Sequence, residues 1–412
     1  MSAPAAAATP TARSAAFEAT KPTEAPAAAA PASSSDTAAT TSAEQPAALP
    51  VVTAGMIDDN KTWDDYLAYR SRHIGIVPAQ HDRDVGERYV IWLRDQFERA
   101  IPDAEVKVLA NNEPVFTARS DAQGRVLFHP KAVNAGTATT FKVIARKVNQ
   151  HTEVVFQSAS KTDLSTSSSA TPSASSHDWV IEMNHVPLAT EAQLDLVFLV
   201  DVTGSMGDEL SKLQATMGEI ANQISQLPQK PSIRYGLVAY GDRGDEFVVK
   251  GYDFTSELAT FQSNLNGMPT VGGGDTPESL NAGLHHALHQ MSWRDQDTVR
   301  LLILMADAPP HLDYTDEPFS YDQDMLVAAA KGVKIIAIGA SGLDGQGEYI
   351  YRQLAQFTGG KFVFLTYAEP SNSASGPGTQ TDHDVTNYGV DTLDRLIVRV
   401  VRDELDALPK TQ

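Results

Sequence analysis

The sequence predicts a multidomain protein: a doubly wound α/β domain with a mostly parallel sheet, preceded by an antiparallel β-sandwich and a disordered N-terminal tail. Three observations lead to this prediction. Between residues 191 and 412, apolar strand patterns alternate with amphipathic helix patterns, which is typical of a parallel sheet covered by helices on both faces. Between 88 and 190, short strand patterns recur roughly every 10 residues, which is typical of a sandwich. Residues 1–50 are dominated by Ala, Pro, Ser and Thr.

The tail, residues 1–50, carries too little apolar surface to offset the chain entropy that folding removes, so we expect it to be disordered. It shows neither the basic start nor the apolar core of a signal peptide. Tethers of this composition are common in exported bacterial proteins. We therefore expect an extracellular, cell-surface or periplasmic location, with an export signal removed or missing. No apolar run reaches the roughly 18–20 residues of a membrane span.

Two segments separate the tail from the α/β region. Residues 51–87 are predicted to be a helical linker, with a helix near 63–70 whose Trp63, Tyr66 and Leu67 share one face and dock on a neighbour. Residues 88–190 are predicted to be the sandwich. Within it, the run 101–130, with the turn Asp121-x-x-Gly124-Arg125, resembles the carboxypeptidase-regulatory-like, transthyretin-like β-sandwich. No catalytic constellation is visible there, so a structural or spacer role is expected.

In the α/β region strands alternate with helices along most of the chain. Apolar runs predict strands at 194–201, 233–240, 247–252, 299–307, 333–339 and 361–365, and amphipathic patterns predict helices near 209–226, 257–266, 277–291, 322–331, 348–357 and 390–405.

The first of these strands ends in a small polar loop with three oxygen-bearing side chains, Asp201, Thr203 and Ser205. In open α/β sheets, ligands gather where strands end and helices begin. Alternate residues of an extended loop can face one side, so the three oxygens can converge on one cation. Oxygen ligands of this kind suit Mg²⁺, Mn²⁺ or Ca²⁺.

This loop, Asp201-x-Thr203-x-Ser205, resembles the Asp-x-Ser-x-Ser metal loop of the von Willebrand factor type A (VWA) family, and the resemblance extends over about 192–408. It implies a Rossmann-like sheet with an antiparallel edge strand at 247–252. It also implies two further metal ligands, Thr276 from the loop 272–278 and Asp307 at the end of a later strand. The family usually has glycine after that aspartate, where this chain has Ala308. Accessory roles beside the metal are expected for Asp275 and Asp208.

The resemblance implies a metal-ion-dependent adhesion site that binds Mg²⁺, or Mn²⁺ or Ca²⁺, and accepts an Asp or Glu carboxylate of a partner protein. We therefore expect protein binding or adhesion without catalysis. The alternative is a recruitment or scaffolding subunit of a larger enzyme or surface machine, with a vacant or structural metal site.

Charge and composition exclude other classes. Residues 191–412 hold 31 acidic and 15 basic residues, which accounts for 16 of the 20 net negative charges of the chain. Such a field repels nucleic acid phosphates. The chain has no cysteine, which rules out disulfides and thiolate metal sites. No Walker phosphate loop is present, and the residues around Ser205 lack the first glycine of Gly-x-Ser-x-Gly.

Two weaker motifs remain. Arg243-Gly244-Asp245 is predicted to be a polar turn between strands. His285 and His289 have the i,i+4 spacing of a zinc-binding pair on a helix, but the glutamate of His-Glu-x-x-His and a third ligand are not evident.

Overall fold

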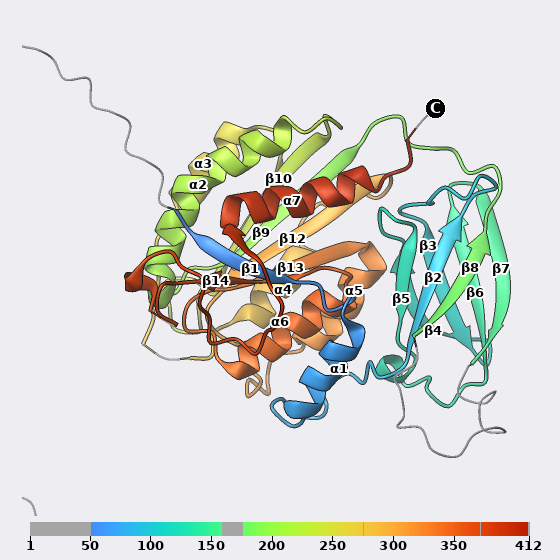
Figure 1. Cartoon of the computed structure of the whole chain (residues 1–412), viewed down its shortest axis with the longest axis horizontal. Coiled ribbons are helices and arrows are strands. Elements are labelled where there is room, and N and C mark those ends of the chain that lie inside the picture. The colour runs from blue at the N-terminus through green and yellow to red at the C-terminus, as the bar shows by residue number, and fades with distance from the viewer. Residues whose placement is uncertain (1–50, 159–175, 275, 371, 411–412) are drawn as a thin grey trace, which may run out of the picture. The chain divides into compact units, whose positions relative to one another are not determined.

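The structure is a computed structural model that describes residues 51–158, 176–274, 276–370 and 372–410. The predicted disordered tail, 1–50, and the predicted accessory residue Asp275 lie outside the described residues. The described residues form an eight-stranded sheet with helices on both faces and a β-rich region with two smaller sheets (Figure 1). None of the described helices is long and apolar enough to cross a bilayer.

The large sheet is mixed, with a parallel centre. Its strand order is β11-β10-β9-β12-β13-β14-β1-β15. The four neighbouring pairs from β10 to β14 are parallel, and β11, β1 and β15 run antiparallel to their neighbours, so the predicted antiparallel edge strand is confirmed. The strands are β1 (Thr53–Ile57), β9 (Gln193–Asp201), β10 (Ser232–Tyr240), β11 (Val249–Thr255), β12 (Thr298–Ala306), β13 (Val333–Gly339), β14 (Phe362–Thr366) and β15 (Val390–Thr392).

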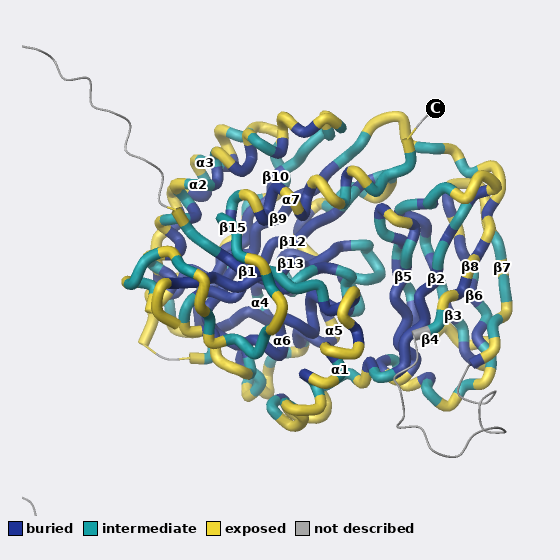
Figure 2. Tube along the Cα trace, viewed as in Figure 1, coloured by how far each residue is buried: buried dark blue, intermediate teal, exposed yellow. Residues whose placement is uncertain are grey.

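Successive side chains of a strand point to opposite faces of the sheet, so an apolar strand presents an apolar surface on both faces. Six of the described helices cover these two faces. In β9, Val197 and Leu199 belong to one buried cluster, whereas Leu196 and Phe198 belong to the other. The first cluster includes α4 (Leu280–His289), α5 (Tyr321–Lys331) and α6 (Gly345–Phe357), and the second includes α2 (Gly207–Ser225), α3 (Leu258–Asn266) and α7 (Leu393–Asp406). The central strands are buried along their length (Figure 2).

The prediction of a helical linker over 51–87 is wrong at its start. Residues 53–57 form β1, which pairs with β14 from Thr53↔Thr366 to Ile57↔Phe362 and also with β15. The sequence does not show this strand, because Thr-Ala-Gly-Met-Ile is short and weakly apolar. Gly55 is required there, since a Cβ at this position would lie 2.4 Å from the ring of Phe364. The predicted helix is present as α1 (Trp63–Arg72), with Trp63 buried.

The β-rich region contains two sheets that pack through aromatic side chains. One has the order β4-β3-β6-β7 and is antiparallel throughout; the other has the order β5-β2-β8. The prediction of a wholly antiparallel region is wrong for β2 and β8, which pair in parallel. Phe141 of the first sheet contacts Trp179 of the second, with centroids 5.9 Å apart. The strands are β2 (Arg88–Arg94), β3 (Glu105–Ala110), β4 (Glu113–Arg119), β5 (Arg125–Phe128), β6 (Thr140–Lys147), β7 (Gln150–Gln157) and β8 (Ser176–Glu182).

Candidate metal site

The predicted metal ligands Asp201 and Asp307 lie side by side at the carboxyl edge of the large sheet. β9 ends at Asp201, and its parallel neighbour β12 ends one residue before Asp307. The pairing runs in register up to Met305↔Val200, so the two aspartates leave adjacent strands at the same edge. This is where an open α/β sheet places its ligands.

The first loop is held in shape by Asp201 itself. Its Oδ1 accepts hydrogen bonds from the Thr203 backbone N (2.9 Å) and from Thr203 Oγ1 (2.7 Å). Thr203 Oγ1 lies 3.4 Å from Ser205 Oγ. The chain then forms a 3₁₀ turn, Gly204–Met206, and enters α2. Asp201 and Thr203 are fully buried, whereas Ser205 is exposed.

The second loop lies against the first. Val271 N donates to Val202 O at 2.8 Å, and the following three glycines all have positive φ, a conformation that residues with a Cβ rarely adopt. A Cβ on Gly273 would lie 3.0 Å from Gly204 N, so glycine also permits the close approach of the two loops. Thr276, the ligand expected from this loop, is exposed.

Each of the two aspartates has one buried oxygen that no described group satisfies. Asp201 Oδ2 and Asp307 Oδ1 have no hydrogen-bond partner among the residues that the structure describes. A buried carboxylate oxygen without a partner is costly unless a cation or a proton is present. The donor set fits a hard divalent cation, since it consists of carboxylates and hydroxyls.

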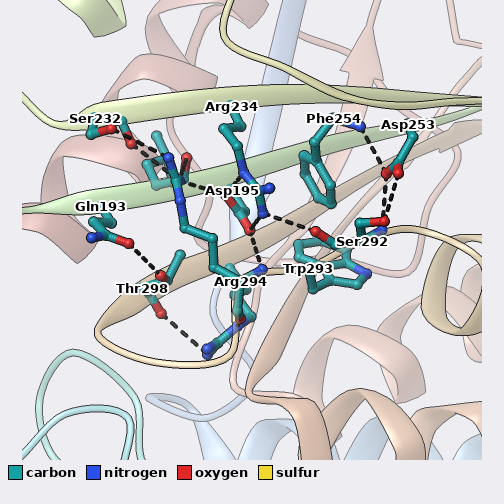
Figure 3. A network of polar contacts seen from close by, with 12 residues as sticks. Gln193, Asp195, Ser232, Arg234, Asp253, Phe254, Ser292, Trp293, Arg294 and Thr298 are labelled. Atoms are coloured by element: carbon teal, nitrogen blue, oxygen red, sulfur yellow. Dashed lines mark hydrogen bonds and ion pairs between the residues drawn. The ribbon is translucent and has the colours of Figure 1, made fainter.

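A second buried aspartate on β9, Asp195, is paired with positive charges, unlike Asp201. Asp195, at the other end of β9, is also fully buried, but its oxygens accept from Arg234 at 2.9 and 2.6 Å and from Arg294 at 2.6 and 2.8 Å (Figure 3). The hydrogen bonds to Asp201, by contrast, come from uncharged groups of Thr203. One strand thus carries two buried carboxylates, of which the protein itself neutralises Asp195.

The raised pKa values of Asp201 and Asp307 are consistent with the absence of a neighbouring positive charge among the described residues. Burial raises the pKa of Asp201 to about 7, and the carboxylate of Asp307 acts in the same direction, although hydrogen bonding from Thr203 opposes it. Burial also raises the pKa of Asp307, with hydrogen bonding from Ser205 opposing and the charge of Glu209 adding to the rise. Carboxyl groups whose pKa values are raised by burial and by one another cluster at functional sites.

Glu278 is a member of the cluster that the sequence did not identify. It is buried beside Asp201, Asp242 and Asp245, and burial followed by the charge of these neighbours raises its pKa to about 8. Its backbone is bonded to the loop after β12, since Glu278 N donates to Pro309 O at 3.0 Å. The sequence feature that could have identified Glu278 is its position two residues after Thr276, in the loop that is predicted to supply a metal ligand.

The accessory role expected for Asp208 finds no support in the position of its side chain. Asp208 is exposed in the first turn of α2. The buried acid of that turn is Glu209, which accepts from Ser341 Oγ at 2.5 Å and from Tyr367 Oη at 3.2 Å. A helix turns by about 100° per residue, so neighbouring acids in one turn face different surroundings.

The region that carries this site matches a known family. Residues 195–372 match the family model of the von Willebrand factor type A domain. An ariadne-like RING finger protein of Acanthamoeba polyphaga mimivirus is 31% identical over 124 residues, 29% of this chain and 12% of that protein. An alpha-protein kinase of Dictyostelium discoideum is 28% identical over 123 residues, 29% of this chain and 19% of that protein.

Human von Willebrand factor A domain-containing protein 7 is 34% identical over 93 residues, 23% of this chain and 10% of that protein. The chain therefore spans less than a fifth of the length of these curated relatives. Among solved structures, that of proximal thread matrix protein 1 from the mussel byssus is similar, with a TM-score of 0.28 and 14% identity over 43% of this chain and 47% of that chain.

Proposed function

We propose that the von Willebrand factor type A domain of this chain binds a divalent cation, preferably Mg²⁺, and through it the acidic side chain of a partner protein. The ligand set proposed is Asp201, Thr203, Ser205, Thr276 and Asp307. The proposed activity is binding, without a catalytic step.

The observation that carries this proposal is the difference between the two buried aspartates of β9. Asp195 is neutralised by two arginines, whereas Asp201 and its neighbour Asp307 each keep a buried oxygen without a hydrogen bond. Since burying an uncompensated carboxylate costs several kcal/mol, a position of this kind is expected to have a counterion in the working protein.

The arrangement of exposure supports the binding of a partner. The side chains of Asp201 and Asp307 are buried, whereas those of Ser205 and Thr276 are exposed and can be reached by a partner. Mg²⁺ prefers six oxygen ligands and commonly retains water. Neutral hydroxyl ligands leave the bound cation with positive charge, which a partner carboxylate can neutralise when it replaces a water.

Calorimetric titration of Mg²⁺ into the metal-free protein tests the first half of the proposal. We expect one ion per chain for the wild type and binding at least about 100-fold weaker for Asp201→Asn, because loss of a direct ligand exceeds the roughly 10- to 100-fold effect of outer-sphere changes. Asp208→Asn, which removes an exposed acid from the helix that follows this loop, should bind Mg²⁺ as the wild type does. Equal binding by wild type and Asp201→Asn would contradict the proposal.

Affinity capture tests the second half. A specific partner should be retained in Mg²⁺, released by EDTA, and lost with Asp201→Asn. Substitution of the partner's contacting Asp or Glu by Asn or Gln should abolish retention. Retention that is insensitive to both EDTA and Asp201→Asn would contradict cation-dependent recognition even if the ion binds.

The alternative role, recruitment within a larger assembly, is favoured by the relatives. The matching region is 12% of a RING finger protein and 19% of an alpha-protein kinase, so in those proteins it accompanies other domains. Under this alternative the same site recruits a protein to an enzyme. An activity that co-purifies with the captured partner in Mg²⁺, and is absent from the isolated chain, would favour it over simple adhesion.

A further inference from the structure

We propose that His285, His289 and Asp324 form a second metal site, suited to Zn²⁺ or a chemically similar divalent transition metal. The three side chains come from two helices that pack against each other, α4 and α5. None of them belongs to the ligand set proposed for Mg²⁺.

The ligand atoms are already gathered around one point. His285 Nδ1 lies 3.1 Å from Asp324 Oδ2, and His289 Nε2 lies 3.0 Å from Asp324 Oδ1. One ligand atom from each residue lies within 4.8 Å of the others. In a tetrahedral zinc site with bonds of about 2.0–2.1 Å, ligand atoms lie roughly 3.3 Å apart. Side-chain rotations that bring the ligand atoms from within 4.8 Å of one another to this spacing would therefore complete the geometry.

The surroundings hold these side chains in place. The ring of His285 stacks on Phe319 at a centroid distance of 4.2 Å and on His289 at 4.1 Å. Asp324 is in the first turn of α5, with its backbone N donating to Ser320 O. Its side chain is 3% exposed, whereas those of His285 and His289 are 31% and 33% exposed. A buried carboxylate flanked by two solvent-accessible imidazoles leaves a fourth position that water can reach.

The chemistry of the set distinguishes it from the Mg²⁺ site. Two imidazoles and one carboxylate suit Zn²⁺, whereas Mg²⁺ prefers oxygen ligands alone. The simpler arrangement is a metal-free cluster in which both imidazole N–H groups donate to Asp324. The two differ in a measurable way, because the hydrogen-bonded cluster has no specific affinity for Zn²⁺.

The sequence supplies the histidine pair but not its third ligand. The i,i+4 spacing of His285 and His289 predicts that both lie on one helix face, and the structure confirms this with the stacked rings. Asp324 lies 35 residues beyond His289 on another helix, so only the packing of α4 against α5 reveals it.

The test uses Zn²⁺ and Co²⁺ on the full chain carrying Asp201→Asn, so that the oxygen site is removed. We expect one Zn²⁺ per chain by calorimetry, and Co²⁺ should give the strong visible absorption of a nitrogen-ligated, four-coordinate ion. His289→Gln and His285→Gln should each weaken Zn²⁺ binding by at least about 100-fold, since even outer-sphere partners alter metal affinity by roughly 10- to 100-fold. His286→Gln is the matched control, because His286 is on the same helix but lies against Gly251 of β11.

Thermal unfolding provides a second readout. Zn²⁺ should raise the Tm of the parent and of His286→Gln, and not that of His289→Gln, because a ligand stabilises only the folded state that binds it. Absence of Zn²⁺ binding to the parent, or equal binding by parent and His289→Gln, would overturn the proposal. Since the parent lacks the oxygen site, either result would leave the proposed Mg²⁺ function unaffected.

Discussion

At the scale of single residues, two buried acids of the candidate site, Asp201 and Glu278, favour the protonated form when no metal is bound. A bound cation would favour the ionised form instead. Burial raises the pKa of Asp201 to about 7 and that of Glu278 to about 8, whereas in an unfolded chain both are near 4. Between these values the folded protein binds more protons than the unfolded one. Its stability therefore falls as pH rises through 7 and 8.

We expect the metal-free protein in EDTA to lose about 2 kcal/mol of unfolding free energy between pH 6.5 and 8.5. Urea denaturation at several pH values measures this. A divalent cation should remove most of the loss, because it stabilises the ionised carboxylates. Asp201→Asn combined with Glu278→Gln should flatten the profile in EDTA. A profile that rises over this pH range would contradict the raised pKa values.

At the scale of elements, β1 completes the large sheet although it precedes the β-rich region in the chain. It lies between β14 and β15. The residues just after it contact α6, since Arg352 of α6 donates hydrogen bonds to Asp59 at 3.0 and 2.7 Å. Arg352 also stacks over Tyr69 of α1, at 3.5 Å from the ring centroid. The segment before the β-rich region therefore contributes a strand to the large sheet and contacts to the helix α6 that packs on it.

A variant lacking residues 1–62 should therefore be much less stable than one lacking residues 1–50, which keeps β1. Loss of Asp59 removes one of the two carboxylates that pair with the buried Arg352, leaving Glu348 at 3.2 Å as the other, and loss of β1 exposes the edge of β14 to association. We expect the Tm to fall by at least about 10 °C, or the variant to aggregate, as measured by calorimetry and light scattering. Equal Tm values for the two deletions would show that β1 contributes little.

At the scale of the whole folded region, the β-rich part and the sheet share buried ion pairs. Arg300 of β12 contacts Asp103 at 2.7 Å, with both side chains at most 5% exposed. Lys334 of β13 contacts Asp121 at 3.1 Å and Glu404 of α7 at 2.7 Å. The charge of Lys334 lowers the pKa of Asp121 although burial acts to raise it. A cavity of about 480 Å³ lies along this boundary.

Lys334→Met should destabilise the protein by about 3 kcal/mol, because Glu404 loses its cation and the buried Asp121 keeps only Arg125, at 3.0 Å. Lys361→Met is the control: Lys361 also reaches α7, but its partner Asp403 is half exposed, at 53%, and such pairs contribute about 0–1 kcal/mol. Urea denaturation compares the two. If both variants lost equally little stability, the buried pairs would not hold the two parts together.

A feature of the fold or of the candidate site could be predicted from the sequence where the residues that form it are close together in the chain. The loop Asp201-x-Thr203-x-Ser205 is recognisable because strand, loop and helix follow one another directly, and the parallel order of the central strands follows from their alternation with helices. Glu278 could not be assigned a role, because its raised pKa comes from burial and from acids 36 and 77 residues earlier in the chain, Asp242 and Asp201.

The sequence by itself determined the α/β class, the polar loop after β9 and the helical face shared by His285 and His289, since each depends on neighbours within one or two turns. Only the tertiary structure decided that β1 joins the sheet, that Asp324 meets the histidine pair, and that Asp195 is neutralised while Asp201 is not. The physical reason is that pairing, burial and charge compensation depend on distance in space, which chain order alone does not specify.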